Sequence, residues 1–300
     1  MKETARALTA GWYWPSLVAY VEVTKPRSVA LLSFTALGTM VLAGAHYPVS
    51  AGVLLLALAA VTLACAGANA ASCYFDRDLD AVMSRTRYRP VPSGRIHPAR
   101  RALYWGMFLF GLSLVLAWNL NLWAWWLLWA GMLGYVGVYS LWLKRRSPWN
   151  IVLGGISGGM PALFGWAAVA GRLELLPVLV AALVILWIPN HIWSLALFHR
   201  EDYARARIPM LPVVTAPERA LRWILLSVVL MVALSLVIVW VGRWGAVYPA
   251  VAAGLGVAAL ALSLHVYRRP RREKAWVLFK FSSPYLAVLF LGMMLDVWLR

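Results

Sequence analysis

The sequence predicts an all-α polytopic membrane protein with nine transmembrane helices. Of its 300 residues, 63% are hydrophobic, and the mean hydropathy is +0.74. Its apolar stretches reach the roughly twenty residues that a helix needs to cross the hydrocarbon of a bilayer. Little of the chain remains between these stretches, so we expect residues 1–300 to form a single intramembrane domain.

The nine predicted spans follow one another through short connections. They cover residues 28–45, 48–75, 102–118, 121–142, 150–170, 176–198, 221–241, 246–266 and 276–299. A tight turn at Asn119–Asn121 joins the third span to the fourth. The first residues, MKETARALTAGWYW, have no apolar core before their first charges, so we expect no cleavable signal there.

The basic residues predict the orientation. Along the nine spans, 24 Lys and Arg fall in the N-terminal segment and the connections after even-numbered spans, against three on the opposite side. This asymmetry places the N-terminus and those loops in the cytoplasm and the C-terminus outside. The net charge of +17 is thereby explained by topology and by contact with anionic lipid, and we expect no nucleic-acid partner.

Three of the eleven acidic residues follow the second span. If the helix continues, Asn69, Asp76 and Asp80 lie on one stripe because they are separated by seven and four residues. Asp78 then points away, toward solvent or an arginine. Pairing with nearby arginines is an alternative role for all three carboxylates.

A second acidic pair, Glu201 and Asp202, follows the sixth span and therefore shares the same side of the membrane. On a continuous helix, His191 would lie on the face that carries Asp202, about three turns deeper. We expect both clusters to face a common cavity. Two like charges one turn apart, as in Asp76 and Asp80, repel unless a cation joins them.

The ion that best fits these carboxylates is Mg²⁺, because it binds one or two carboxylates together with substrate phosphate oxygens. Arginines follow both clusters, in RTRYRPVP (85–92) and ARARIPMLP (204–212), and their planar guanidinium groups suit phosphate. These features indicate a metal-bridged diphosphate. The similarity of the two loops also predicts a duplicated four-helix unit with a ninth helix appended.

The motifs resemble those of the UbiA superfamily of intramembrane prenyltransferases, specifically its haem-modifying branch. The resemblance rests on VTKPRSVALLSFTAL (23–37), DRDLDAVMSRTRYRPVPSGRI (76–96), NIVLGGISGGMPALFGWAAVAG (150–171) and NHIWSLALFHREDYARARIPMLPVV (190–214). Ser72 and Ile192 depart from it, since many relatives carry Asn and an aromatic residue there.

The resemblance implies a UbiA-like fold and farnesyl transfer from farnesyl diphosphate to the vinyl group of haem B, giving haem O. It implies catalytic roles for Asp76, Asp80 and Asp202; Mg²⁺ binding by these and Asn69; diphosphate binding by Lys25, Arg85, Arg87, Arg89 and Arg205; and haem binding by His191 and Trp193. A hydrogen bond to another helix is an alternative role for His191.

Two other functions remain open. A related enzyme could prenylate a quinone precursor, and a non-enzymatic membrane carrier could bind haem. The resemblance further implies partners that use the product, such as haem A synthase or terminal oxidase assembly proteins.

Overall fold

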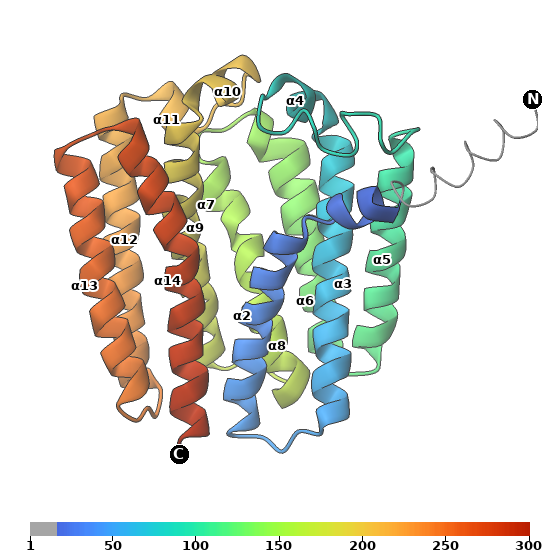
Figure 1. The fold of residues 1–300 in the computed structure, drawn as a ribbon. Helices are drawn as coiled ribbons and strands as arrows, with labels where there is room; N and C mark the ends of the chain where they lie inside the picture. The colour runs from blue at the N-terminus through green and yellow to red at the C-terminus, as the bar shows by residue number, and fades with distance from the viewer. Residues whose placement is uncertain (1–16) are drawn as a thin grey trace, which may run out of the picture.

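Nine membrane-spanning helices make up the bundle. The computed structural model describes residues 17–300, and within them nine helices are long and apolar enough to cross a membrane (Figure 1). They are α2 (Pro26–Gly44), α3 (Ala51–Phe75), α5 (Arg100–Trp118), α6 with its continuations η1 and η2 (Leu122–Arg145), α7–η3–α8 (Asn150–Ala170), α9 (Leu175–Phe198), α12 (Pro217–Val241), α13 (Val247–Arg268) and α14 (Arg272–Trp298). The predicted all-α fold with nine spans is confirmed. The prediction about a signal falls on residues 1–14, outside the described part of the chain.

Small residues determine how closely the membrane helices approach one another. At the crossing of α3 and α5, a Cβ added to Gly67 would lie 2.5 Å from the carbonyl oxygen of Gly106. A Cβ added to Gly106 would lie 2.7 Å from the oxygen of Gly67. Helices in lipid gain stability mainly from such close packing, because lipid and protein interior are similarly apolar.

Two apolar cores share helices and so join the bundle into one unit. One core contains side chains of α2, α3, α5, α6 and α8, and the other contains side chains of α2, α8, α9, α12, α13 and α14. The last helix, α14, packs directly on the first span, since a Cβ at Gly38 would lie 2.5 Å from the Phe290 ring. The bundle is thus closed by contact between its first and last spans. The predicted internal duplication stays a prediction.

Three short helices gather at one end of the bundle, opposite the C-terminus (Figure 1). They are α4 (Arg77–Val82), α10 (Arg200–Arg205) and α11 (Leu211–Val214). A hydrogen bond from Ser84 to Asp202 joins the loop after α4 to α10. The two acidic segments therefore lie on the same side of the bundle, as predicted.

Candidate active site

A cavity of about 630 Å³ lies inside the bundle below these short helices. Its charged lining residues are Lys25, Arg27, Asp76, Asp80, Arg85, Arg89 and Lys144. Its deeper wall is apolar and includes Val61, Ala64, Ala68, Leu127, Leu128 and Met132. Asp76 and Val61 are fifteen residues apart on one helix, so the lining extends about 22 Å along α3. The cavity therefore combines a charged end with an apolar interior of considerable length.

The first acidic motif reaches this cavity through a slight break in the helix. Helix α3 ends at Phe75, and Asp76 has φ −91° and ψ 2°. The break keeps helical spacing, because the Asp76 amide donates to the Ser72 carbonyl at 2.9 Å and the Asp80 amide donates to the Asp76 carbonyl at 2.8 Å. Asp76 and Asp80 consequently both line the cavity together with Asn69.

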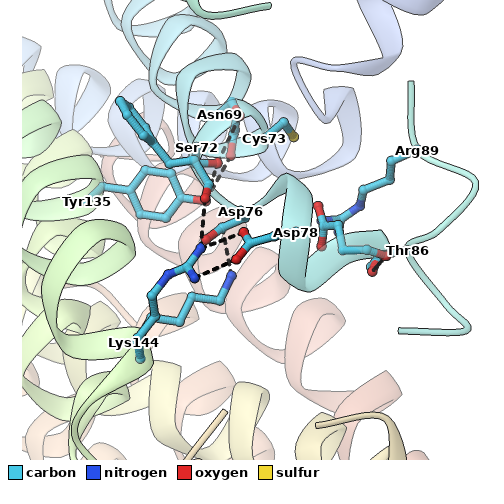
Figure 2. Close-up of polar contacts among 12 residues, drawn as sticks. Asn69, Ser72, Cys73, Asp76, Asp78, Thr86, Arg89, Tyr135 and Lys144 are labelled. Atoms are coloured by element: carbon cyan, nitrogen blue, oxygen red, sulfur yellow. Dashed lines mark hydrogen bonds and ion pairs between the residues drawn. The ribbon is translucent and has the colours of Figure 1, made fainter. Parts of the chain in front are cut away.

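The two buried aspartates bond to different basic residues. Lys144, from the end of the fourth span, donates to Asp76 Oδ2 at 2.7 Å (Figure 2). Arg89 donates to both oxygens of Asp80, at 2.9 and 2.8 Å. Asp76 Oδ1 is buried and has no partner within the described chain. A buried acceptor without a donor costs about 1–3 kcal/mol, so this oxygen is available to a ligand.

Lys25 enters the site from the start of α2. Its backbone lies in the left-handed region, with φ 57° and ψ 65°. This conformation is uncommon for lysine, and such strain tends to occur at functional sites. Its Nζ donates to Ser72 Oγ at 2.9 Å and lies 3.4 Å from the Tyr135 hydroxyl, which in turn donates to Asn69 Oδ1 at 3.3 Å. Ser72 thus accepts a hydrogen bond from the Lys25 ammonium group, one of the positive charges of the site.

Aromatic side chains form another wall of the charged end. Tyr135 and Tyr139 are stacked, with ring centroids 5.9 Å apart and an interplanar angle of 16°. Both project from the π-helix η1 (Leu133–Trp142). Segments of π-helix are rare and occur frequently at functional sites. Sequence reasoning missed both tyrosines and Lys144, because they lie within or beside a span that looks uniformly apolar.

The oxygen atoms around Asp76 suit a hard divalent cation. Asp76 and Asn69 offer carboxylate and amide oxygens, and Mg²⁺ commonly takes one or two carboxylates with substrate phosphates. Asp80 would contribute only after releasing Arg89. Across residues 17–300, no three or more His, Cys, Asp or Glu side chains are grouped so that they could hold a metal ion by themselves. The donor set fits a cation that arrives with an anionic substrate.

Asp202 does not line this cavity, in contrast to the predicted shared site. Helix α9 ends at Phe198 and α10 begins at Arg200, with His199 (φ −103°, ψ 30°) between them, and the Asp202 carboxylate is bonded to the loop after α4. The Ser84 hydroxyl donates to both Asp202 oxygens at 2.9 and 2.7 Å, the Ser84 amide donates at 3.2 Å, and Arg205 is also bonded. Burial raises the pKa of Asp202, but these hydrogen bonds outweigh it and lower the pKa overall. Asp202 therefore fastens the loop after α4.

The remaining predicted diphosphate residues separate into two groups. Lys25, Arg85 and Arg89 line the cavity. Arg87 is exposed and lies over the Tyr88 ring, and Arg205 bonds to Asp202 on the surface. Asp78 is also exposed, and it accepts two hydrogen bonds of 2.7 Å from Arg145, as the stripe on the helix predicts.

The two predicted haem residues point in different directions. His191 lines the cavity, and Trp193 does not. Trp193 is buried beside Trp149, with ring centroids 6.4 Å apart. Positions two apart on a helix differ by about 200°. Trp187, one turn before His191, stacks on the imidazole instead.

Comparison with known proteins agrees with this architecture. The model of the UbiA prenyltransferase family matches residues 31–289. A Desulforudis audaxviator protein named protoheme IX farnesyltransferase is 72% identical over 282 residues, covering 94% of this chain and 89% of its own. A solved structure of digeranylgeranylglyceryl phosphate synthase has a TM-score of 0.77 at 21% identity, over 94% of this chain and 98% of that one. An Archaeoglobus fulgidus UbiA homolog bound to GPP and Mg²⁺ has a TM-score of 0.64 at 18% identity, over 92% and 99%. The chain belongs to the UbiA prenyltransferase family.

Proposed function

We propose that this protein transfers the farnesyl group of farnesyl diphosphate to a vinyl group of haem B and so makes haem O. The C1–O bond of the donor breaks and leaves diphosphate. The terminal vinyl carbon then bonds to C1 of the allylic cation. Water supplies the hydroxyl group at the other vinyl carbon, and its remaining proton leaves with diphosphate.

The observation that carries this proposal is the division of the cavity. Lys25, Arg85, Arg89 and Lys144 surround two buried carboxylates at one end, and an apolar lining continues along α3. A prenyl diphosphate has the same division between a highly charged group and a long hydrocarbon. The relative that shares 72% of its residues over 94% of this chain, named protoheme IX farnesyltransferase, supports haem as acceptor.

We assign the diphosphate to the charged end. Lys25 and Arg85 would meet its oxygens directly, and Lys144 and Arg89 would exchange their carboxylate partners for phosphate. Asp76 and Asn69 would hold Mg²⁺, with Asp80 joining once Arg89 turns to the substrate. When bound, the cation neutralises charge that develops on the leaving group. Once they bond to the diphosphate, the basic side chains stabilise the same charge.

Two features suit the cationic stage of the reaction. The faces of Tyr135 and Tyr139 lie beside the charged end, and aromatic faces attract cations. The loop between α4 and α5 covers this end, and Asp202 secures it through Ser84. Excluding bulk water protects the allylic cation until the vinyl group attacks. Arg87 and Arg205 would then act at the surface, where they attract the anionic substrate or help to set the orientation of the chain in the membrane.

We further infer from the basic loops that the charged end faces the cytoplasm and that the C-terminus lies outside, in the cytoplasmic membrane. Haem A synthase or a terminal oxidase assembly protein would receive the product. Protein embedded in inside-out vesicles tests the orientation: protease added outside should cleave the loop at residues 83–98.

The decisive experiment for function uses purified full-length protein with haem B, farnesyl diphosphate and Mg²⁺. We expect a haem of longer retention on reversed-phase chromatography, heavier by one farnesyl group and one hydroxyl, with one diphosphate released per haem consumed. A quinone precursor replaces haem in a second reaction. Product only in that reaction would favour the other kind of prenyltransferase, and haem binding without diphosphate release would favour a carrier.

A further inference from the structure

The imidazole of His191 is held on both faces, so only its edges are free to interact. Trp187 stacks on one side, with centroids 4.5 Å apart and planes at 19°. Phe279 of α14 lies near the ring at 4.6 Å and 33°. The Trp187 indole is itself fixed, because Nε1 donates to the Ser282 carbonyl at 2.7 Å. This arrangement leaves the two ring nitrogens as the functional atoms.

The hydrogen bonds around Ser282 determine which nitrogen carries the proton. The Ser282 hydroxyl donates to the Phe279 carbonyl at 2.6 Å, and a carbonyl can only accept. The same Oγ lies 2.6 Å from His191 Nδ1. A hydroxyl has one proton, so Oγ must accept from Nδ1–H when both bonds are present. In the neutral imidazole the lone pair is then on Nε2.

Among residues 17–300 the one hydrogen bond recorded for the imidazole is through Nδ1, so Nε2 is left without a partner, while the ring forms part of the cavity wall. A histidine serving only to join two helices would need no more than its bond to Ser282. Histidines that bind metals almost always donate their other N–H to a hydrogen-bond acceptor, which fixes the tautomer and raises the basicity of the ligating nitrogen. Here a hydroxyl backed by a carbonyl provides that acceptor.

We propose that Ser282 is a positioning residue that holds His191 in its Nδ1–H tautomer, so that Nε2 is presented to the iron of the haem acceptor. This rests on the proposed function, since it assumes that haem enters the cavity. It assigns to α14, which carries none of the acidic motifs, the task of orienting the acceptor. Trp187 and Phe279 keep the imidazole plane in one orientation, and Ser282 selects the free nitrogen.

Binding of ferric haem B to the full-length protein in detergent tests the proposal, with metal-free protoporphyrin IX as the matched ligand. We expect Ser282→Ala to weaken ferric haem binding by about 10–100-fold, as for other residues that support metal ligands. Its Soret band should shift toward that of His191→Ala, while affinity for the metal-free porphyrin stays unchanged. Ser282→Thr retains the hydroxyl and should restore both affinity and spectrum.

Three results would overturn the proposal: an unchanged spectrum and affinity in Ser282→Ala, an equal loss for haem and the metal-free porphyrin, or haem ligation that persists in His191→Ala. If Ser282→Ala does not fold, His191→Gly with added imidazole decides instead. Imidazole should then restore the spectrum, and failure to do so counts against ligation at this position. Diphosphate release is scored separately, so ligated haem without transfer would refute the proposed function and leave this inference standing.

Discussion

Replacing Asp202 and Ser84 separately tests whether Asp202 binds the metal ion or holds the loop after α4 in place. Hydrogen bonds to a charged group contribute about 1.5–3 kcal/mol each. Ser84→Ala removes the hydroxyl that contacts both Asp202 oxygens but keeps the amide bond. We expect a loss of about 2 kcal/mol in the closed loop, or roughly a thirtyfold rise in its open population, at 1.4 kcal/mol per tenfold. Asp202→Ala removes all these contacts and should cost about 4 kcal/mol.

Hydrogen–deuterium exchange of residues 77–90 measures loop opening, and a magnesium titration of farnesyl transfer measures metal binding. Both variants should raise exchange and the KM for farnesyl diphosphate while leaving the magnesium dependence unchanged. Ser93→Ala is the matched control, because the Ser93 hydroxyl lies in the same loop but bonds to the Arg89 carbonyl and the exposed Arg95 side chain rather than to Asp202. If Ser84→Ala behaves like wild type and Asp202→Ala needs far more magnesium, Asp202 is a metal ligand and our reasoning fails.

Three further predictions follow from the contacts of the site. Asp76→Asn should reduce kcat by at least about a hundredfold, on the scale of losing one preorganised electrostatic contact, with ferric haem affinity retained; equal loss of haem binding and of the unfolding temperature would instead show a structural role. Arg89→Met should lower kcat/KM for farnesyl diphosphate far more than Arg87→Met, and equal effects would contradict the division between cavity and surface arginines. The hydrogen bond from Arg145 lowers the pKa of Asp78 to about 2. This pair therefore stabilises the fold above the unfolded pKa of about 4 and loses that contribution as pH falls toward 2. Asp78→Asn should lower the unfolding temperature slightly at pH 7 and less at pH 3, and a difference that stays constant with pH would contradict the assignment.

The nine spans could be predicted from the sequence because each is recognised from the hydropathy of its own residues. Every predicted span ends within four residues of the observed helix. The stripe of Asn69, Asp76 and Asp80 was also predictable, since the hydrogen bonds across the break at Asp76 preserve helical spacing. Local periodicity is sufficient where one helix determines the geometry.

Partners from distant segments could not be predicted in the same way. Lys144 was counted among residues that set topology, yet it bonds to Asp76 from 68 positions away. Asp202 was expected to face the cavity, but Ser84, 118 positions away in the sequence, donates to its carboxylate. No spacing rule reveals such a partner, because the contact depends on how two loops pack at the end of the bundle.

The position of α14 has a consequence for the order in which the protein becomes competent during synthesis. This helix supplies Phe279 and Ser282 to the cavity and seals the bundle through Phe290 against Gly38. The acidic motif and the basic residues that surround it are all made earlier. A nascent chain could therefore assemble the charged end before the wall beside His191 exists. The cavity is therefore enclosed only after the last span has been synthesised and packed.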